Sequence, residues 1–165
     1  MGFSERDEVS DKKKYELVIA KAIETHQPDM FAAGSEEHLE VVLNALCQSA
    51  KSRIWLLSKR FNERIFSNRC TSAIEECGAK NCDIRILLTE KPKVLSDKLA
   101  KYMKIQTEVS EKKLPCMIIV DNDYFCIQLI ESSAESLICY YKSSEAMKNH
   151  VLPMIAIFET VWNNL

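Results

Sequence analysis

The feature that most constrains this chain is an alternation of two hydrophobic spacings between residues 35 and 103. Helical spacing marks residues 36–50 and 62–77, and each segment is followed by a short apolar run, "RIWLLS" at 53–58 and "CDIRILLT" at 82–89. A third short helix is expected at "KPKVLSDKLAKYM". Because helix–strand repeats place successive strands parallel through right-handed crossovers, the pattern predicts an α/β fold.

The last third of the chain changes to strand-like runs with little room for helices between them. Asn122 and Asp123 suit the turn of a hairpin, and a closing helix is expected in 143–165, with Pro153 as a kink or as the start of its final segment. The fold class predicted is α/β, with a mixed central sheet flanked by helices. The four expected strands are "KIQTEVS", "PCMIIVD", "YFCIQLI" and "SLICYY".

One domain is expected over residues 11–165, after a frayed N-terminus at 1–10. A helix at 12–23 begins with three lysines that we interpret as a solvated face. Residues 25–34 contain Pro28 and Gly34 and are interpreted as a linker. Two helix boundaries are also expected, an N-cap at Ser35 and a C-terminus at Gly78.

The charge balance limits the classes of partner. A net charge of -2 with 28% charged residues provides no global attraction to nucleic acid, so a nucleic-acid role needs a local patch. No apolar stretch has the length of a membrane span, and the start of the chain lacks the apolar core of a secretory signal. The expected location is the cytoplasm, without a membrane partner.

Seven cysteines are spread through segments that otherwise resemble helix and strand cores. Most are therefore expected to be reduced and buried. Cys70, Cys77 and Cys82 form the cluster that could hold structural zinc, but their spacings are unlike those of a zinc knuckle, and packing is the favoured interpretation. No metal and no cofactor are expected.

Several phrases resemble a phospholipase D-like domain over about residues 35–165. They are "AKSRIWLLSKRFN", "CDIRILLTEKP", "LPCMIIVDNDYFCIQL" and "IFETVW". The resemblance implies the fold described above, and it implies a catalytic hairpin at residues 112–129.

The chemistry of that family depends on a histidine, one residue, a lysine, four residues and an aspartate. Aligning the hairpin by Asp121 places Leu114 at the histidine and Cys116 at the lysine, so the nucleophile and the stabilising cation are both absent. The expected function is a catalytically inactive module that acts as a binding, regulatory or accessory subunit, for example in a microbial defence or regulatory complex. The alternative is a nuclease or phosphodiesterase with a divergent or metal-assisted site.

The resemblance also implies an assembly state, because short one-half members of the family pair as homodimers. A protein partner or a homodimer is therefore expected. Three aromatic residues, Trp55, Tyr140 and Trp162, are expected either in that interface or in the core. Nucleic acid stays open as a ligand that the net charge does not support.

Overall fold

The computed structural model describes residues 5–27, 29–32, 36–58, 68–90, 97–105, 116–128, 137–142, 145, 149 and 151–165. The strands are β1 (Asp29–Ala32), β2 (Arg53–Ser58), β3 (Asp83–Leu88), β4 (Met103–Ile105), β5 (Cys116–Val120), β6 (Tyr124–Gln128) and β7 (Leu137–Tyr141). The helices are α1 (Glu5–Glu24), α2 (Glu36–Ser49), α3 (Asn68–Ala79), α4 (Asp97–Ala100) and α5 (Val151–Asn163).

The strands form one mixed seven-stranded sheet in the order β1-β7-β6-β5-β2-β3-β4. The helix-connected strands β2, β3 and β4 are parallel, as the alternation of spacings predicts. The remaining pairings, β2 with β5 and then β5 through β6 and β7 to β1, are antiparallel. These findings confirm the predicted α/β class and its mixed sheet.

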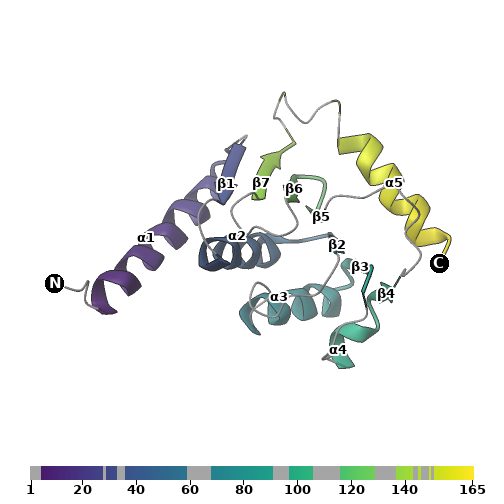
Figure 1. The fold of residues 1–165 in the computed structure, drawn as a ribbon, viewed down its shortest axis with the longest axis horizontal. Coiled ribbons are helices and arrows are strands. Elements are labelled where there is room, and N and C mark those ends of the chain that lie inside the picture. Colours follow the sequence, from purple (N-terminus) through teal and green to yellow (C-terminus); the bar gives the residue numbers. More distant parts are fainter. Residues whose placement is uncertain are drawn as a thin grey trace.

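Two hydrophobic cores lie on opposite faces of the sheet. Helix α5 lies apart from α1, α2 and α3, across the strands (Figure 1). The larger core joins α1, α2 and α3 to one face, with fully buried residues such as Leu46, Ile74 and Ile86. On the other face the smaller core joins α5 to the sheet through Phe158, Trp55 and their neighbours. Within the part of the chain that the structure describes, α5 is therefore the helix that accompanies this second face.

The N-terminal expectations need two corrections. Helix α1 begins at Glu5, so the described residues 5–10 are helical rather than frayed. The segment interpreted as a linker contains β1, which pairs antiparallel with β7, Phe31 opposite Ile138. Pro28 makes the local sequence resemble a linker. The segment forms a strand because it pairs with β7, which lies far along the chain.

Helix α3 does not end at Gly78, which lies inside the helix. The residue past the end is Asn81, with a φ of 66° in the left-handed region. The N–H of Cys82 donates to the Cys77 carbonyl at 3.1 Å, and the N–H of Asn81 donates to the Gly78 carbonyl at 3.1 Å. This is a Schellman motif, in which asparagine takes the position usually held by glycine.

The remaining boundaries of helices and strands agree in part with those predicted from the sequence. The third expected helix is helical only at α4, and β4 starts at Met103, while residues 91–96 and 106–115 lie outside the described residues. Pro153 lies in the first turn of α5, where its missing N–H costs nothing. The expected N-cap Ser35 and the first residues of the expected helix at 62–77 also fall outside the described ranges. None of the described helices is long and apolar enough to cross a membrane.

Candidate functional site

The hairpin that carries the family motif is formed by β5 and β6, joined by the turn at residues 121–123. Asp121 adopts a left-handed φ of 56°, which carboxylate and amide side chains tolerate better than most. The N–H of Asp123 donates to the Val120 carbonyl at 3.2 Å and closes the turn. The predicted turn at Asn122 and Asp123 is therefore confirmed.

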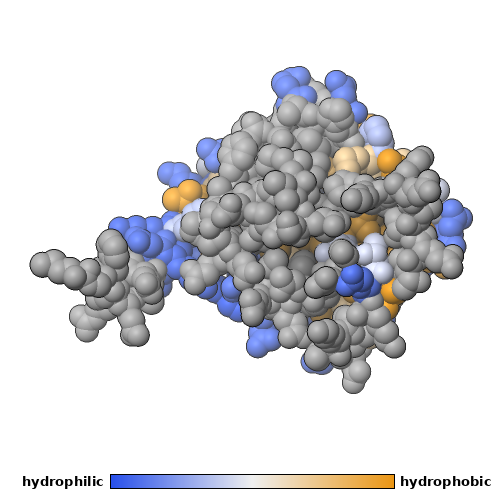
Figure 2. Space-filling model, viewed as in Figure 1, coloured by the Kyte–Doolittle hydropathy of each residue, from blue (hydrophilic) through white to orange (hydrophobic). Residues whose placement is uncertain are grey.

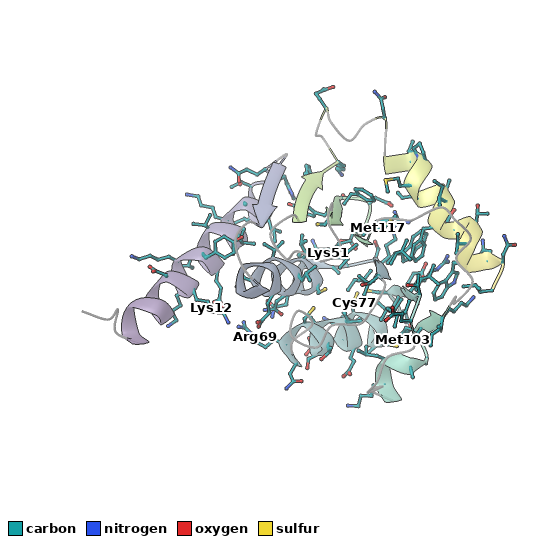
Figure 3. All side chains as sticks on the ribbon, viewed as in Figure 1. Lys12, Lys51, Arg69, Cys77, Met103 and Met117 are labelled. Atoms are coloured by element: carbon teal, nitrogen blue, oxygen red, sulfur yellow. The ribbon has the colours of Figure 1, made fainter. Side chains whose placement is uncertain are left out.

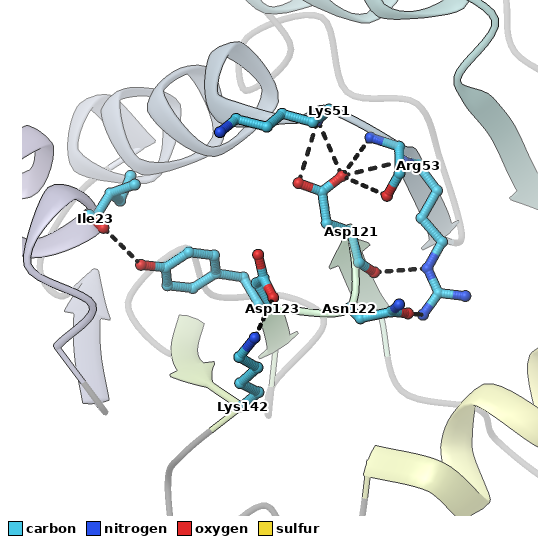
Figure 4. Close-up of polar contacts among 9 residues, drawn as sticks. Ile23, Lys51, Arg53, Asp121, Asn122, Asp123 and Lys142 are labelled. Atoms are coloured by element: carbon cyan, nitrogen blue, oxygen red, sulfur yellow. Dashed lines mark hydrogen bonds and ion pairs between the residues drawn. The ribbon is translucent and has the colours of Figure 1, made fainter.

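The Asp121 carboxylate fastens this turn to the start of β2 (Figure 4). Its Oδ1 accepts from the backbone N–H groups of Lys51, Ser52 and Arg53 at 3.0, 2.7 and 3.1 Å, and from the Ser52 hydroxyl at 3.0 Å. Arg53 returns two bonds, from Nε to the Asp121 carbonyl and from Nη2 to Asn122 Oδ1, each 2.6 Å. The two segments are thus held together by side-chain and main-chain bonds in both directions.

These bonds set the charge of Asp121. Burial alone raises the pKa of the carboxyl, but the N–H bonds from Ser52, Arg53 and Lys51 outweigh burial and lower the pKa below its ordinary value. The carboxylate is therefore ionised at neutral pH. Because four donors converge on one of its oxygens, this group acts as a structural acceptor.

The motif positions do not converge in the described structure. Met117 pairs with Leu57 and Val120 pairs with Ile54, so Cys116 lies at the carboxyl end of β2 and Asp121 at its amino end. The length of β5, roughly 17 Å at the usual rise per residue, separates the two. Leu114 and the side chain of Cys116 lie outside the described residues.

The cysteine cluster lies among α2, α3 and the strand that follows. Cys70 Sγ is 3.6 Å from Cys47 Sγ, and Cys82 Sγ is 3.2 Å from the Lys51 carbonyl. The bond with Cys70, together with burial, raises the pKa of Cys47, and burial raises that of Cys77 to about 12. Among the described residues, no group of three or more His, Cys, Asp or Glu side chains is arranged to hold a metal ion.

A second polar feature lies on the α5 face of the sheet and was not singled out by sequence reasoning. Cations and tryptophan rings alternate across β2, β3, β4 and α5, and we name this the cation–aromatic row. Its members are Arg53, Trp55, Arg85, Trp162 and Lys104. The signal in the sequence is one cation in each of three largely apolar strands, within "RIWLL", "DIRILL" and "MKI".

Two of the three expected interface aromatics belong to this row. Trp55 is 2% exposed and stacks on Phe158 with 5.1 Å between ring centroids, so it is a core residue. Trp162 is half-buried and stacks on the same Phe158 at 6.1 Å. Tyr140 pairs with Phe125 in the backbone register of the sheet, but its side chain is outside the described set.

No family model matches the chain, and no curated protein matches it. Three solved structures are similar. TrmBL2, an archaeal chromatin protein with a novel mode of DNA binding, has a TM-score of 0.53 and 18% identity over 96% of this chain and 62% of its own. NucT from Helicobacter pylori has a TM-score of 0.54 and 11% identity over 82% and 94% of the two chains. Nuc from Salmonella typhimurium, a phospholipase D family member, has a TM-score of 0.47 and 16% identity over 74% and 86%.

The two likenesses with TM-scores above 0.5 concern the fold. The chain has an α/β fold with a mixed sheet, and NucT and TrmBL2 share this fold. It spans 62% of the length of the archaeal chromatin protein, and identities of 11% and 18% establish fold rather than activity.

Proposed function

We propose that this chain is a non-catalytic phospholipase D-like module that acts by binding, as a regulatory or accessory subunit. The observation that carries the proposal is the composition of the motif hairpin. Leu114 and Cys116 occupy the positions of the attacking histidine and the charge-stabilising lysine, and neither an aliphatic side chain nor a thiol can stabilise phosphoryl charge as lysine does.

The environment of Asp121 supports the same conclusion. The remaining motif residue accepts bonds from Lys51, Ser52 and Arg53, and its pKa is lowered by them. A carboxyl that stays ionised and hydrogen-bonded near neutral pH is poorly suited to donating a proton to a leaving group. Asp121, the motif residue that this chain retains, thus stabilises the hairpin.

Nucleic acid is the ligand class that we propose first. The chromatin protein described as DNA-binding matches 96% of this chain, although that likeness extends to only 62% of the chromatin protein. The net charge of -2 disfavours this class unless cations gather locally, and the cation–aromatic row is such a gathering. A protein partner or a second copy of the chain stays predicted alongside it.

The alternative is a nuclease or phosphodiesterase with a divergent or metal-assisted site. The fold of NucT favours it, since fold similarity raises the prior for a shared reaction without establishing it. A thiolate at Cys116 would be the nucleophile to test, because a cysteine is the side chain in the motif with covalent reactivity.

Turnover assays separate the two functions. The wild-type protein is incubated with bis(p-nitrophenyl) phosphate and with linear DNA, in EDTA and in Mg²⁺ or Mn²⁺. We expect no turnover above the rate of a mock purification from cells that lack the protein. Turnover that is lost in Cys116→Ala but kept in the matched variant Cys82→Ala would establish the enzyme instead.

A further inference from the structure

The cation–aromatic row runs diagonally across three parallel strands. Arg53 pairs with Asp83, Trp55 pairs with Arg85, and Leu87 pairs with Lys104, so each cation lies one strand over and two residues further along. Strand separation and rise place neighbouring cations roughly 8 Å apart at the backbone. The sheet register alone therefore gathers the three cations on one face.

Tryptophan rings separate the cations. The Arg85 guanidinium is 4.5 Å from the ring centroid of Trp55 and 5.7 Å from that of Trp162. Lys104 Nζ is 4.4 Å from the Trp162 centroid and donates to the Trp162 carbonyl at 3.2 Å. Such contacts keep the cationic groups in defined positions over the rings instead of leaving them as free surface chains.

Arg85 keeps donors for a ligand. Its Nε bonds to Asp83 Oδ1 at 3.1 Å, while Nη1 and Nη2 make no hydrogen bond among the contacts of the described residues. The Arg85 side chain is 24% exposed, and the Nη1–Nη2 end of its guanidinium is the part without a hydrogen-bond partner among the described residues. This end presents two parallel N–H groups, which is the geometry that binds a phosphate or a carboxylate in bidentate fashion.

The cations of the row differ in how far carboxylates of the same chain compensate their charge. Arg53 is bonded to the Asp121 carbonyl and Asn122 and lies near the Glu159 and Asp83 carboxylates, so its charge is compensated within the chain. Arg85 shares Asp83, and Lys104 forms no ion pair with a described carboxylate. Lys104 is thus the cation of the row that no ion pair with a described carboxylate neutralises.

We infer that Arg85 and Lys104, on either side of Trp162 in the row, bind the phosphodiester backbone of a single-stranded nucleic acid. The inference rests on the proposed binding function. Each phosphodiester carries one negative charge, and a duplex presents about twice the linear charge density of a single strand and needs a broader basic surface than two cations provide. Cations already lie over the tryptophan rings, so bases do not stack on these rings. The strand is therefore bound through its phosphates, and binding is tolerant of base sequence.

The two tryptophans of the chain both belong to the row, so intrinsic fluorescence reports this site directly. The experiment titrates the folded protein with oligothymidine of about 15 nucleotides and follows tryptophan emission and the anisotropy of a labelled strand. We expect a saturable change in emission, and a salt dependence with a slope of about -1.4 for two phosphate contacts. In Trp162→Phe the emission change should be reduced to the part that comes from Trp55, which Arg85 also contacts, while the anisotropy change is retained.

The variants are Arg85→Gln and Lys104→Gln, with Arg69→Gln as the matched control. Arg69 is 63% exposed, pairs with Glu16 and lies on α3 (Figure 3). Helix α3 packs on the face of the sheet opposite to the row. Each row variant should weaken binding on the order of tenfold and reduce the salt slope by about 0.7, and the control should do neither. Thermal unfolding of every variant identifies loss of fold. If Arg85→Gln is unstable, Lys104→Gln alone tests the binding site.

Four results would overturn the inference. They are no emission change at saturating strand, equal weakening by Arg69→Gln and the row variants, tighter binding of a duplex than of the single strand, and equal competition by inorganic phosphate, anionic vesicles or polyglutamate. None of these bears on catalysis, which the turnover assay measures separately. A non-catalytic protein that fails to bind the strand therefore disproves the row's role without disproving the proposed module.

Discussion

Asp121 is the residue where the sequence motif and the fold meet. The left-handed backbone conformation of Asp121 turns the chain between β5 and β6. Its carboxylate accepts hydrogen bonds from the backbone N–H groups of Lys51 and Ser52, which precede β2, and of Arg53, the first residue of β2. One side chain thus fixes the turn and satisfies the amide groups at the start of the neighbouring strand. A residue with this role stabilises the fold whether or not the protein is an enzyme.

We expect Asp121→Asn to lower the free energy of unfolding by about 1–2 kcal/mol, because a neutral amide is a weaker acceptor for four donors and the site is partly solvated. The folded-state pKa of Asp121 is lowered, so its stabilisation is fully present above the ordinary value of 3.8 and is lost as pH falls through the folded-state value. Urea unfolding from neutral to acidic pH should therefore show the wild type and the variant converging below about pH 4.

The neighbouring carboxylate is the control. Asp123 pairs with the exposed Lys142 at 3.1 Å on the same turn (Figure 4), and a surface pair of this kind contributes little. Asp123→Asn should change the free energy of unfolding by less than about 0.5 kcal/mol. Equal losses for the two variants would mean that the bonds to Lys51, Ser52 and Arg53 do not stabilise the hairpin.

At the scale of elements, the sequence predicted what depends on local pattern. The bounds of β2 agree with "RIWLLS" because a continuous apolar run is buried on both faces of the sheet. Strand β1 could not be predicted, since its pairing with β7 comes from a distant segment. The cation–aromatic row was missed for the same reason, because only the register of β2, β3 and β4 brings its cations together.

The end of α3 could not be inferred from glycine content, because Gly78 has a packing role. A Cβ at residue 78 would meet the Tyr102 ring, with Cζ at 2.7 Å. We expect Gly78→Ala to destabilise the wild type by about 1 kcal/mol, since displacement of the ring outweighs the higher helix propensity of alanine. In a Tyr102→Ala background the same change should be neutral or stabilising.

This double-mutant cycle, measured by thermal unfolding, isolates the contact between α3 and the residue before β4. Identical effects of Gly78→Ala in the two backgrounds would show that Tyr102 does not limit the packing of the helix. Ala79→Gly is the matched backbone control, because it changes the neighbouring residue of the same last turn.

At the scale of the whole molecule, the two faces of the sheet are unequally covered by the described helices. Helices α1, α2, α3 and α4 contribute to the larger core, whereas among the described helices α5 alone contributes to the smaller one. Helix α5 also has apolar residues on its outer side, with Leu152 72% and Ile157 45% exposed, and apolar surface is visible in the region of α5 in Figure 2. Its one charged residue is Glu159.

That outer side of α5 is where we expect a second copy of the chain to pack. A twofold pair brings identical surfaces together, and a helix with a single charge places little like-charge repulsion between the copies. Trp55 cannot take part because it is buried, so the apolar contact falls to residues such as Leu152 and Ile157.

Light scattering across a concentration series measures this association. We expect the mass to rise from one chain to two, and Ile157→Asp to shift the transition at least tenfold toward higher concentration, because a central carboxylate would be buried without a partner. Leu17→Asp on α1, where Leu17 is 71% exposed, is the matched control and should leave the transition unchanged. A wild-type mass that stays at one chain up to millimolar concentration would reject the homodimer. The expected assembly would then be a complex with a different protein, sought by co-purification from the native host and tested against the same Ile157→Asp variant.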